Sequence, residues 1–126
     1  MLGSTNIIAF VPTRNPDQAR KFYEQTLGLR FVSDDGFALV FDANGVMVRV
    51  VRVQEITPAP YTILGWQVQN IEEVVAKLAQ TGVRFERYGF FKQDDLGIWT
   101  APGGARVAWF KDPDGNTLSV SEHKTS

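Results

Sequence analysis

The stretch IIAFVPTRNPDQARKFYEQTLGLRF, residues 7–31, decides the fold, because its plan returns in ILGWQVQNIEEVVAKLAQTGVRF, residues 63–85. Each copy reads as a short apolar strand, a helix that begins at an asparagine and ends at a glycine, and an Arg-Phe pair at the start of the next strand. The two copies keep nearly the same spacing between these features. Such a period indicates an internal duplication, and this duplication sets the fold before any single motif does.

The first copy continues through short apolar segments separated by glycine turns. Its helix should begin at Asn15, bury Tyr23 for structural reasons and end at Gly28. Asp35-Gly36 and Asn44-Gly45 favour tight hairpin turns, whose central positions need positive φ. We therefore predict strands over residues 7–11, 29–33, 37–42 and 46–53.

The second copy follows a proline-spaced segment, residues 55–60, which lacks periodicity and is expected to be a linker. Its helix should begin at Asn70, with Glu73 completing a capping box, and should end at Gly82. The sequence Asp-Pro-Asp-Gly at 112–115 favours a final hairpin turn. We predict strands over residues 63–68, 83–88, 97–101, 105–111 and 117–121.

Each copy is thus predicted to be a βαβββ module, in which one helix covers one face of a sheet and leaves the other face bare. We expect a single α+β domain over residues 1–126, with module 1 at about 6–54 and module 2 at about 61–123. Two half-covered sheets have to cover each other or enclose something. We therefore expect them to form an open curved mixed sheet around a cleft, which is a natural place for a ligand.

The composition narrows the functional classes. The net charge is -1, with 13 basic and 14 acidic residues mixed along the chain, so neither nucleic acid nor an anionic membrane is an expected partner. The chain has no cysteine, which excludes disulfides, thiolate metal sites and thiol catalysis. No signal-peptide pattern and no long apolar run is present, so a cytoplasmic location is expected.

Two motifs resemble a known family. Lys21-Phe22-Tyr23-Glu24 with Leu27-Gly28-Leu29 is similar to the helix end of the vicinal oxygen chelate superfamily, and residues 108–116, AWFKDPDGN, are similar to its last hairpin. Glyoxalase I, extradiol dioxygenases and bleomycin-resistance proteins belong to that superfamily. Together with the duplicated plan, the resemblance covers nearly the whole chain.

The resemblance implies where a metal would be held in members that use one. It places two ligands on the opening strands, typically His or Gln, and two on the closing strands, typically Glu. In this chain the four positions carry Ile8, Arg49, Ile63 and Ser119. Two hydrocarbons, a permanently protonated guanidinium and a hydroxyl are poor ligands for a divalent ion. We therefore expect no metal and no other cofactor.

Arg49 is the most informative single residue of the first module. Strand alternation puts Met47 and Arg49 on the face opposite a run of valines, so Arg49 should point into the cleft. There it could anchor a carboxylate, phosphate or phenolate of a ligand. Alternatively it pairs with a carboxylate across a module or dimer boundary, or extends outward into solvent.

In the second module the same alternation exposes Ile63, Gly65 and Gln67 to the cleft and packs Trp66 into the core. Gln67 could offer a donor and an acceptor to a ligand, or could bond to a neighbouring strand or to water. Gly65 leaves space for a ligand ring or for a close contact within the sheet.

A long irregular stretch, residues 87–96, carries several aromatic rings and lies next to Trp99. These rings could close over a flat ligand by stacking, or could fill the mouth of the cleft or a subunit interface; the second role is favoured for Phe90 and Phe91. Asp94 and Asp95 on the same stretch are expected to be solvated. His123, the only histidine, is near the end of the chain and is expected to be exposed rather than catalytic.

These observations favour a metal-free binding protein over an enzyme. We expect a homodimer whose cleft holds a small aromatic or anionic molecule. The alternatives are a metal-dependent lyase, isomerase or dioxygenase, or a metal-free enzyme in which Arg49 stabilises an enolate, although that enzyme would lack a candidate base. No catalytic residue is assigned. The predicted ligand-binding residues are Ile8, Phe10, Met47, Arg49, Ile63, Gly65, Gln67, Trp99 and Ser119.

Overall fold

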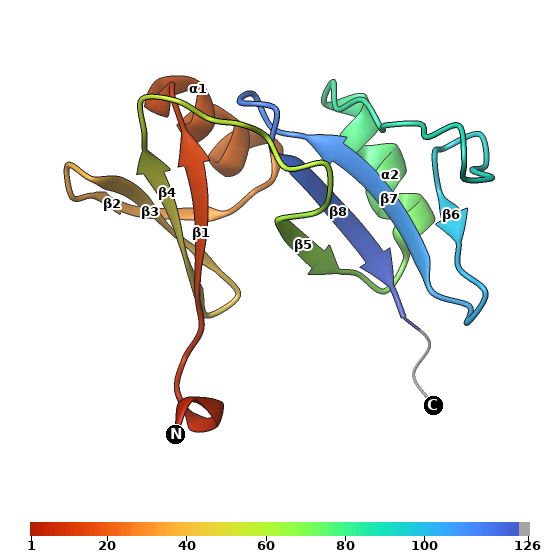
Figure 1. The fold of residues 1–126 in the computed structure, drawn as a ribbon, viewed down its shortest axis with the longest axis horizontal. Coiled ribbons are helices and arrows are strands. Elements are labelled where there is room, and N and C mark those ends of the chain that lie inside the picture. Colours follow the sequence, from red (N-terminus) through yellow and green to blue (C-terminus); the bar gives the residue numbers. More distant parts are fainter. Residues whose placement is uncertain (124–126) are drawn as a thin grey trace. The chain divides into compact units, whose positions relative to one another are not determined.

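A computed structural model describes residues 1–123 and shows two compact units, Met1–Pro58 and a second unit that begins at Ala59 (Figure 1). The boundary between them falls inside the predicted linker at residues 55–60. Each unit is a βαβββ module with a four-stranded mixed sheet, which confirms the predicted α+β class.

The first unit starts with a short 3-10 turn, η1 (Leu2–Ser4), before its sheet and helix. The sheet order is β1-β4-β3-β2, with β1 parallel to β4 and the other pairs antiparallel. The helix α1 lies against β4. The elements are β1 (Ile8–Thr13), α1 (Pro16–Lys21), η2 (Phe22–Thr26), β2 (Arg30–Asp34), β3 (Ala38–Ala43) and β4 (Val46–Arg52).

The first helix differs from its prediction in one respect. It begins as expected, because the Asn15 side chain accepts a hydrogen bond from the Gln18 amide and Pro16 occupies the first turn. After Lys21, however, the chain widens into one π-helical turn, η2, and then ends near Gly28 at φ 78°. This turn carries the fully buried Tyr23, whose ring packs on Phe41 at 6.0 Å between centroids.

The predicted two-faced pattern of β4 is confirmed. Val48 and Val50 are buried, whereas Met47, on the other face of the strand, is 41% exposed. Val46, at the start of the strand, is the exception on the valine face and is 38% exposed. The buried valines lie on the side of the sheet that carries the core of this unit. Alternate residues of β1 and β4 therefore lie on the opposite, open face.

The second unit repeats the order as β5-β8-β7-β6, again with one parallel pair, β5 and β8. The helix α2 begins at Asn70, whose side chain accepts from the Glu73 amide, and it lies against β7 and β8 (Figure 1). Ile71 and Val75 are buried on this side. The elements are β5 (Leu64–Gln67), α2 (Ile71–Gln80), β6 (Trp99–Thr100), β7 (Arg106–Lys111) and β8 (Thr117–Glu122).

The predicted strand at residues 83–88 is wrong. Only Phe85 forms an isolated bridge, to Phe110, and Glu86 donates its amide to the Trp109 carbonyl at 2.7 Å. The chain then leaves the edge of β7 and returns to it only at β6, where Trp99 pairs with Val107. Residues 87–98, here called the edge loop, therefore connect two short segments, at Phe85 and at β6, that both pair with the same edge of β7.

The side chain of Gln93 explains why the ladder stops. Its amide nitrogen donates to the carbonyls of Glu86 and Gly97, both at 2.8 Å, and its oxygen accepts from the Tyr88 amide at 2.8 Å. Backbone groups that a strand would pair with its neighbour are bonded to this side chain instead.

The last hairpin turn is held by Asp112, as the Asp-Pro-Asp-Gly sequence predicts. One carboxylate oxygen accepts from the amides of Asp114 and Asn116, and the other accepts from the Asn116 side chain at 2.9 Å. Within residues 1–123, every helix is too short or too polar to span a lipid bilayer.

Candidate ligand-binding site

Four predicted site residues lie together on the open face of the first unit. Ile8 is the register partner of Met47, and Phe10 is the partner of Arg49. Ile8 is 46% exposed and Phe10 is 60% exposed, although both are large apolar side chains. The open face is thus an apolar strip with one cation at its centre.

Arg49 is already neutralised within its own module. Its guanidinium donates to Asp35 at 2.7 Å, and this hydrogen bond, with backbone donors from Ala38 and Phe37, lowers the pKa of Asp35 to about 2. The partner is the aspartate of the β2–β3 hairpin turn. The boundary-crossing pair, predicted as an alternative, is therefore not the contact that the structure shows.

A second pair stands beside the first. Arg52 contacts both carboxylate oxygens of Asp34, at 2.8 and 2.7 Å, and the hydrogen bond from Arg52 is the main reason that the pKa of Asp34 falls to about 2. Two cations of β4 are therefore held by two adjacent acids of one turn. Neither cation is an uncommitted anchor for an anionic ligand.

The open face of the second unit contains the other predicted strand residues. Gly65 is the register partner of Ser119, and Gln67 is the partner of Ser121. A β-carbon at Gly65 would lie 3.0 Å from the Ser119 hydroxyl oxygen and 3.3 Å from its carbonyl oxygen. Gly65 therefore allows a close contact with Ser119 within the sheet, which is one of its two predicted roles; space for a ligand ring stays a prediction. Ile63, just before β5, donates its amide to the Thr117 carbonyl.

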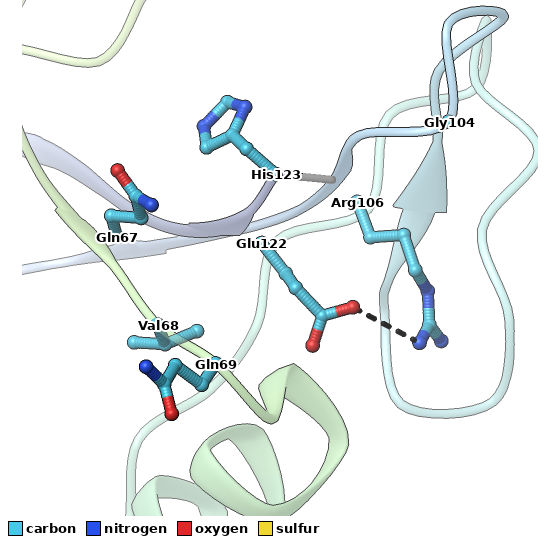
Figure 2. A pocket seen from close by; sticks show the side chains of 7 residues that line it. All are labelled: Gln67, Val68, Gln69, Gly104, Arg106, Glu122 and His123. Carbon is cyan, nitrogen blue, oxygen red and sulfur yellow. Dashed lines mark ion pairs between the residues drawn. The ribbon is translucent and has the colours of Figure 1, made fainter. Parts of the chain in front are cut away.

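A polar pocket of about 510 Å³ lies where β5 and β8 end (Figure 2). In Figure 2 the Glu122 side chain points towards Arg106, while Gln67 and His123 extend away from that ion pair. Arg106 is held at 2.7 Å by Glu72 and at 4.0 Å by Glu122. The pocket is lined by Gln67, Val68, Gln69, Gly104, Arg106, Glu122 and His123.

The charged groups of this polar pocket also have structural partners. Glu122 accepts a hydrogen bond from the Ile71 amide and so caps the start of α2. The hydrogen bond with Glu72 raises the pKa of Arg106. His123 is exposed, as predicted, and its Nε2 lies 2.9 Å from the Ser121 hydroxyl oxygen.

A second pocket, here called the aromatic pocket, has a volume of about 520 Å³ and lies between the linker end and the edge loop. The rings of Phe91 and Trp109 are stacked at 5.2 Å with an interplanar angle of 4°. Trp99 extends this stack, since its ring lies 4.4 Å from that of Phe91. The pocket is lined by Pro60, Tyr61, Thr62, Tyr88, Phe90, Phe91 and Trp109.

Trp109 is the functional candidate that sequence reasoning missed. Its neighbours in β7, Ala108 and Phe110, are buried, so strand alternation alone turns Trp109 to the open face. The same alternation that was applied to β4 would have found it. Of the predicted site residues, only Trp99 joins this cluster.

The side chains at the four implied metal positions do not fit a divalent cation. Ile8 and Ile63 have no donor atom, and Arg49 is protonated and bound to Asp35. Ser119 alone has an oxygen. Among the described residues, no group of three or more His, Cys, Asp or Glu side chains is arranged to hold a metal ion.

The fold and the open sheet faces define a class: proteins built from paired βαβββ modules. The chain belongs to the Glyoxalase/Bleomycin resistance protein/Dioxygenase superfamily, whose family model matches residues 5–120. This result confirms the family resemblance seen in the two motifs. A search of curated proteins finds no match to the chain.

Solved structures with the same fold come from several bacteria. A superfamily member from Sphaerobacter thermophilus DSM 20745 has a TM-score of 0.76 at 23% identity, covering 98% of this chain and 100% of that one. A glyoxalase family protein from Bacillus anthracis has a TM-score of 0.74 at 20% identity, covering 96% of each chain. Lactoylglutathione lyase from Agrobacterium tumefaciens has a TM-score of 0.73 at 18% identity, covering 94% and 93%. At these identities the likeness extends to the fold alone.

Proposed function

We propose that this chain binds a small aromatic or anionic molecule without a chelated metal. The observation that carries the proposal is the aromatic pocket, in which rings from the edge loop and from β7 line a space of about 520 Å³. That volume is within the range of small-molecule sites, and stacked rings bind flat apolar groups over their faces.

The structure supports the aromatic half of this proposal more than the anionic half. Arg49 and Arg52 are each bonded to an aspartate, so the open face of the first unit presents no uncommitted guanidinium. An anion would have to displace Asp35 or Asp34 to reach them. The predicted cleft between the modules and the predicted homodimer stay predictions.

Ligand-dependent unfolding temperature and tryptophan fluorescence together test this function. A panel of aromatic metabolites and antibiotics is screened by thermal unfolding, in which a ligand at 100 times its dissociation constant adds about 2.7 kcal/mol of stability. Each hit is then titrated against the protein while tryptophan emission is followed. We expect saturable quenching, because Trp99 and Trp109 belong to the aromatic cluster.

Two variants localise the site. Trp109→Leu is expected to weaken ligand binding and to remove the Trp109 part of the quenching, whereas Trp66→Leu should leave both unchanged, because Trp66 stacks on the buried Phe110 on the other side of the same sheet. Equal binding by both variants would place the ligand elsewhere.

A metal-dependent lyase or dioxygenase is the alternative function. It requires turnover that a chelator abolishes and that one divalent metal restores. The donor set at Ile8, Arg49, Ile63 and Ser119 argues against it. Stoichiometric, tight uptake of zinc, nickel or iron by the purified protein would overturn the metal-free proposal.

A further inference from the structure

The proposed function places a small-molecule site at the aromatic pocket. Resting on that site, and going beyond the aromatic or anionic ligands named above, we propose that the pocket selects an organic cation, of which a quaternary ammonium group is the simplest form. Its geometry and its rigidity contribute to this selectivity, and its uncharged lining does not oppose a cation. Cations bind over the negative faces of aromatic rings, and this attraction becomes stronger where water is excluded.

The rings around the pocket stand in two perpendicular orientations. The rings of Phe91 and Trp109 are nearly parallel, with 4° between their planes. Tyr88 stands at 82° to Phe91 and at 80° to Trp109, with centroid distances of 6.2 and 5.4 Å. A flat neutral ligand can stack on only one of these orientations. A compact, roughly spherical cation can touch rings of both.

Phe90 adds a further ring to the Tyr88 side. Its plane lies 24° from that of Tyr88 at 5.8 Å, and its side chain is 79% exposed. Tyr61, from the linker end, is 66% exposed. Such exposed rings lose apolar contact with water when a ligand binds, so they add affinity to the cation–π attraction.

The charge at the pocket does not oppose a cationic ligand. None of the seven lining residues is charged, and their side-chain polar atoms are hydroxyls and the indole nitrogen. Burial, and then the negative charge of Glu86, raises the pKa of Tyr88, so a carboxylate acts on this ring. Glu86 itself is paired with Lys111 at 3.6 Å, so its charge is largely compensated. An anionic ligand would find no guanidinium or ammonium group among the lining residues, whereas a cation needs only the ring faces.

The pocket is held in shape before a ligand arrives. Gln93 ties the edge loop together through three hydrogen bonds of 2.8 Å. Asp94 accepts from the amides of Leu96 and Ile98, both at 2.9 Å. A preorganised cage avoids the entropic cost of ordering its rings on binding, which matters for a small ligand with few contacts.

The test compares choline with its neutral analogue, in which a quaternary carbon replaces the nitrogen. Both are titrated at matched ionic strength while the indole signals of uniformly labelled protein are followed by nuclear magnetic resonance. We expect choline to shift the Trp109 and Trp99 signals, to leave Trp66 unchanged, and to bind about tenfold more tightly than the analogue. Equal affinities for the two compounds would overturn the inference.

Matched variants locate the effect without threatening the fold. Phe90→Leu removes an exposed ring of the pocket, and Phe37→Leu removes a ring of similar exposure, 77%, in the other unit. Choline binding should weaken at least threefold in the first variant and stay unchanged in the second. Tyr88→Phe keeps the ring face and loses only the hydroxyl, so it should retain choline binding. Loss of binding in Tyr88→Phe, or equal loss in both leucine variants, would contradict the cation–π account.

The failure of this inference is separable from the failure of the proposed function. If a neutral planar compound such as indole shifts Trp109 and choline does not, the pocket binds small molecules but does not select cations. If neither choline, its analogue nor any aromatic compound of the panel binds, both proposals are wrong.

Discussion

Gln93 offers the sharpest test of how the edge loop is held. In Gln93→Leu, the Tyr88 amide and the carbonyls of Glu86 and Gly97 lose their partner, which removes three hydrogen bonds of 2.8 Å. Each hydrogen bond contributes about 1 kcal/mol, so the free energy of unfolding should fall by at most about 3 kcal/mol. Because the segment is half-buried, water will replace some of these bonds, and we expect a loss of about 1–3 kcal/mol.

Two measurements check this expectation. Urea unfolding gives the loss in free energy, and hydrogen exchange gives the protection of the Tyr88 amide, which donates to Gln93 in the wild type. We expect that amide to exchange much faster in the variant. Aromatic or choline binding should also weaken, since the loop carries Tyr88, Phe90 and Phe91 into the pocket.

The controls separate the hydrogen bonds from the change in polarity. Gln93→Glu keeps the shape and one acceptor but removes both donors, so it should be destabilised as well. Gln69→Leu makes the same chemical change at an exposed position outside the edge loop and should alter the stability by less than about 0.5 kcal/mol. A Gln93→Leu protein with unchanged stability and unchanged protection at Tyr88 would refute the reasoning.

Three further predictions concern the sheets and their turns. The pKa values of Asp34 and Asp35 are lowered to about 2, so their stabilising effect is present above pH 4 and disappears as the pH falls towards 2. Carboxyl titration by nuclear magnetic resonance checks the two pKa values. Asp35→Asn should make the loss of folding stability between pH 4 and pH 2 smaller. Gly65→Ala should lower the free energy of unfolding in urea by about 1–3 kcal/mol, because its β-carbon would lie 3.0 Å from the Ser119 hydroxyl oxygen. An unchanged urea midpoint would show that β5 and β8 can move apart without cost. Asn70→Ala removes the cap of α2 and should lower the free energy of unfolding by about 1 kcal/mol, with Asn70→Ser largely restoring it.

The predicted fold depended on signals that are local or periodic, and these were the signals that the structure confirmed. Caps at Asn15 and Asn70 form because a side chain needs to reach an amide only three residues away. The valine face of β4 follows from the alternation of a strand, whatever the sheet around it. The strand predicted at residues 83–88 was wrong although its local sequence favours a strand. The cause is Gln93, several residues further on, whose side chain bonds to the backbone groups of Glu86 and Tyr88.

The site was less accessible to such reasoning. Alternation placed Ile8, Phe10, Met47 and Arg49 on one face, but it could not tell that Arg49 reaches the turn acid Asp35, because that contact depends on how β3 and β4 pair. The aromatic pocket needs three separate segments, near Tyr61, Tyr88 and Trp109, to meet in space.

The sequence by itself determined the duplicated modules, the helix ends, the turns and the side-chain chemistry at the implied metal positions, because each of these depends on residue type and short spacing. Only the tertiary structure decided which cations are neutralised and which rings meet at right angles. The ion pairs join residues 14 and 18 positions apart, and Tyr88 meets Trp109 from a different segment. The geometry of these contacts follows from sheet register and packing, which no local pattern encodes.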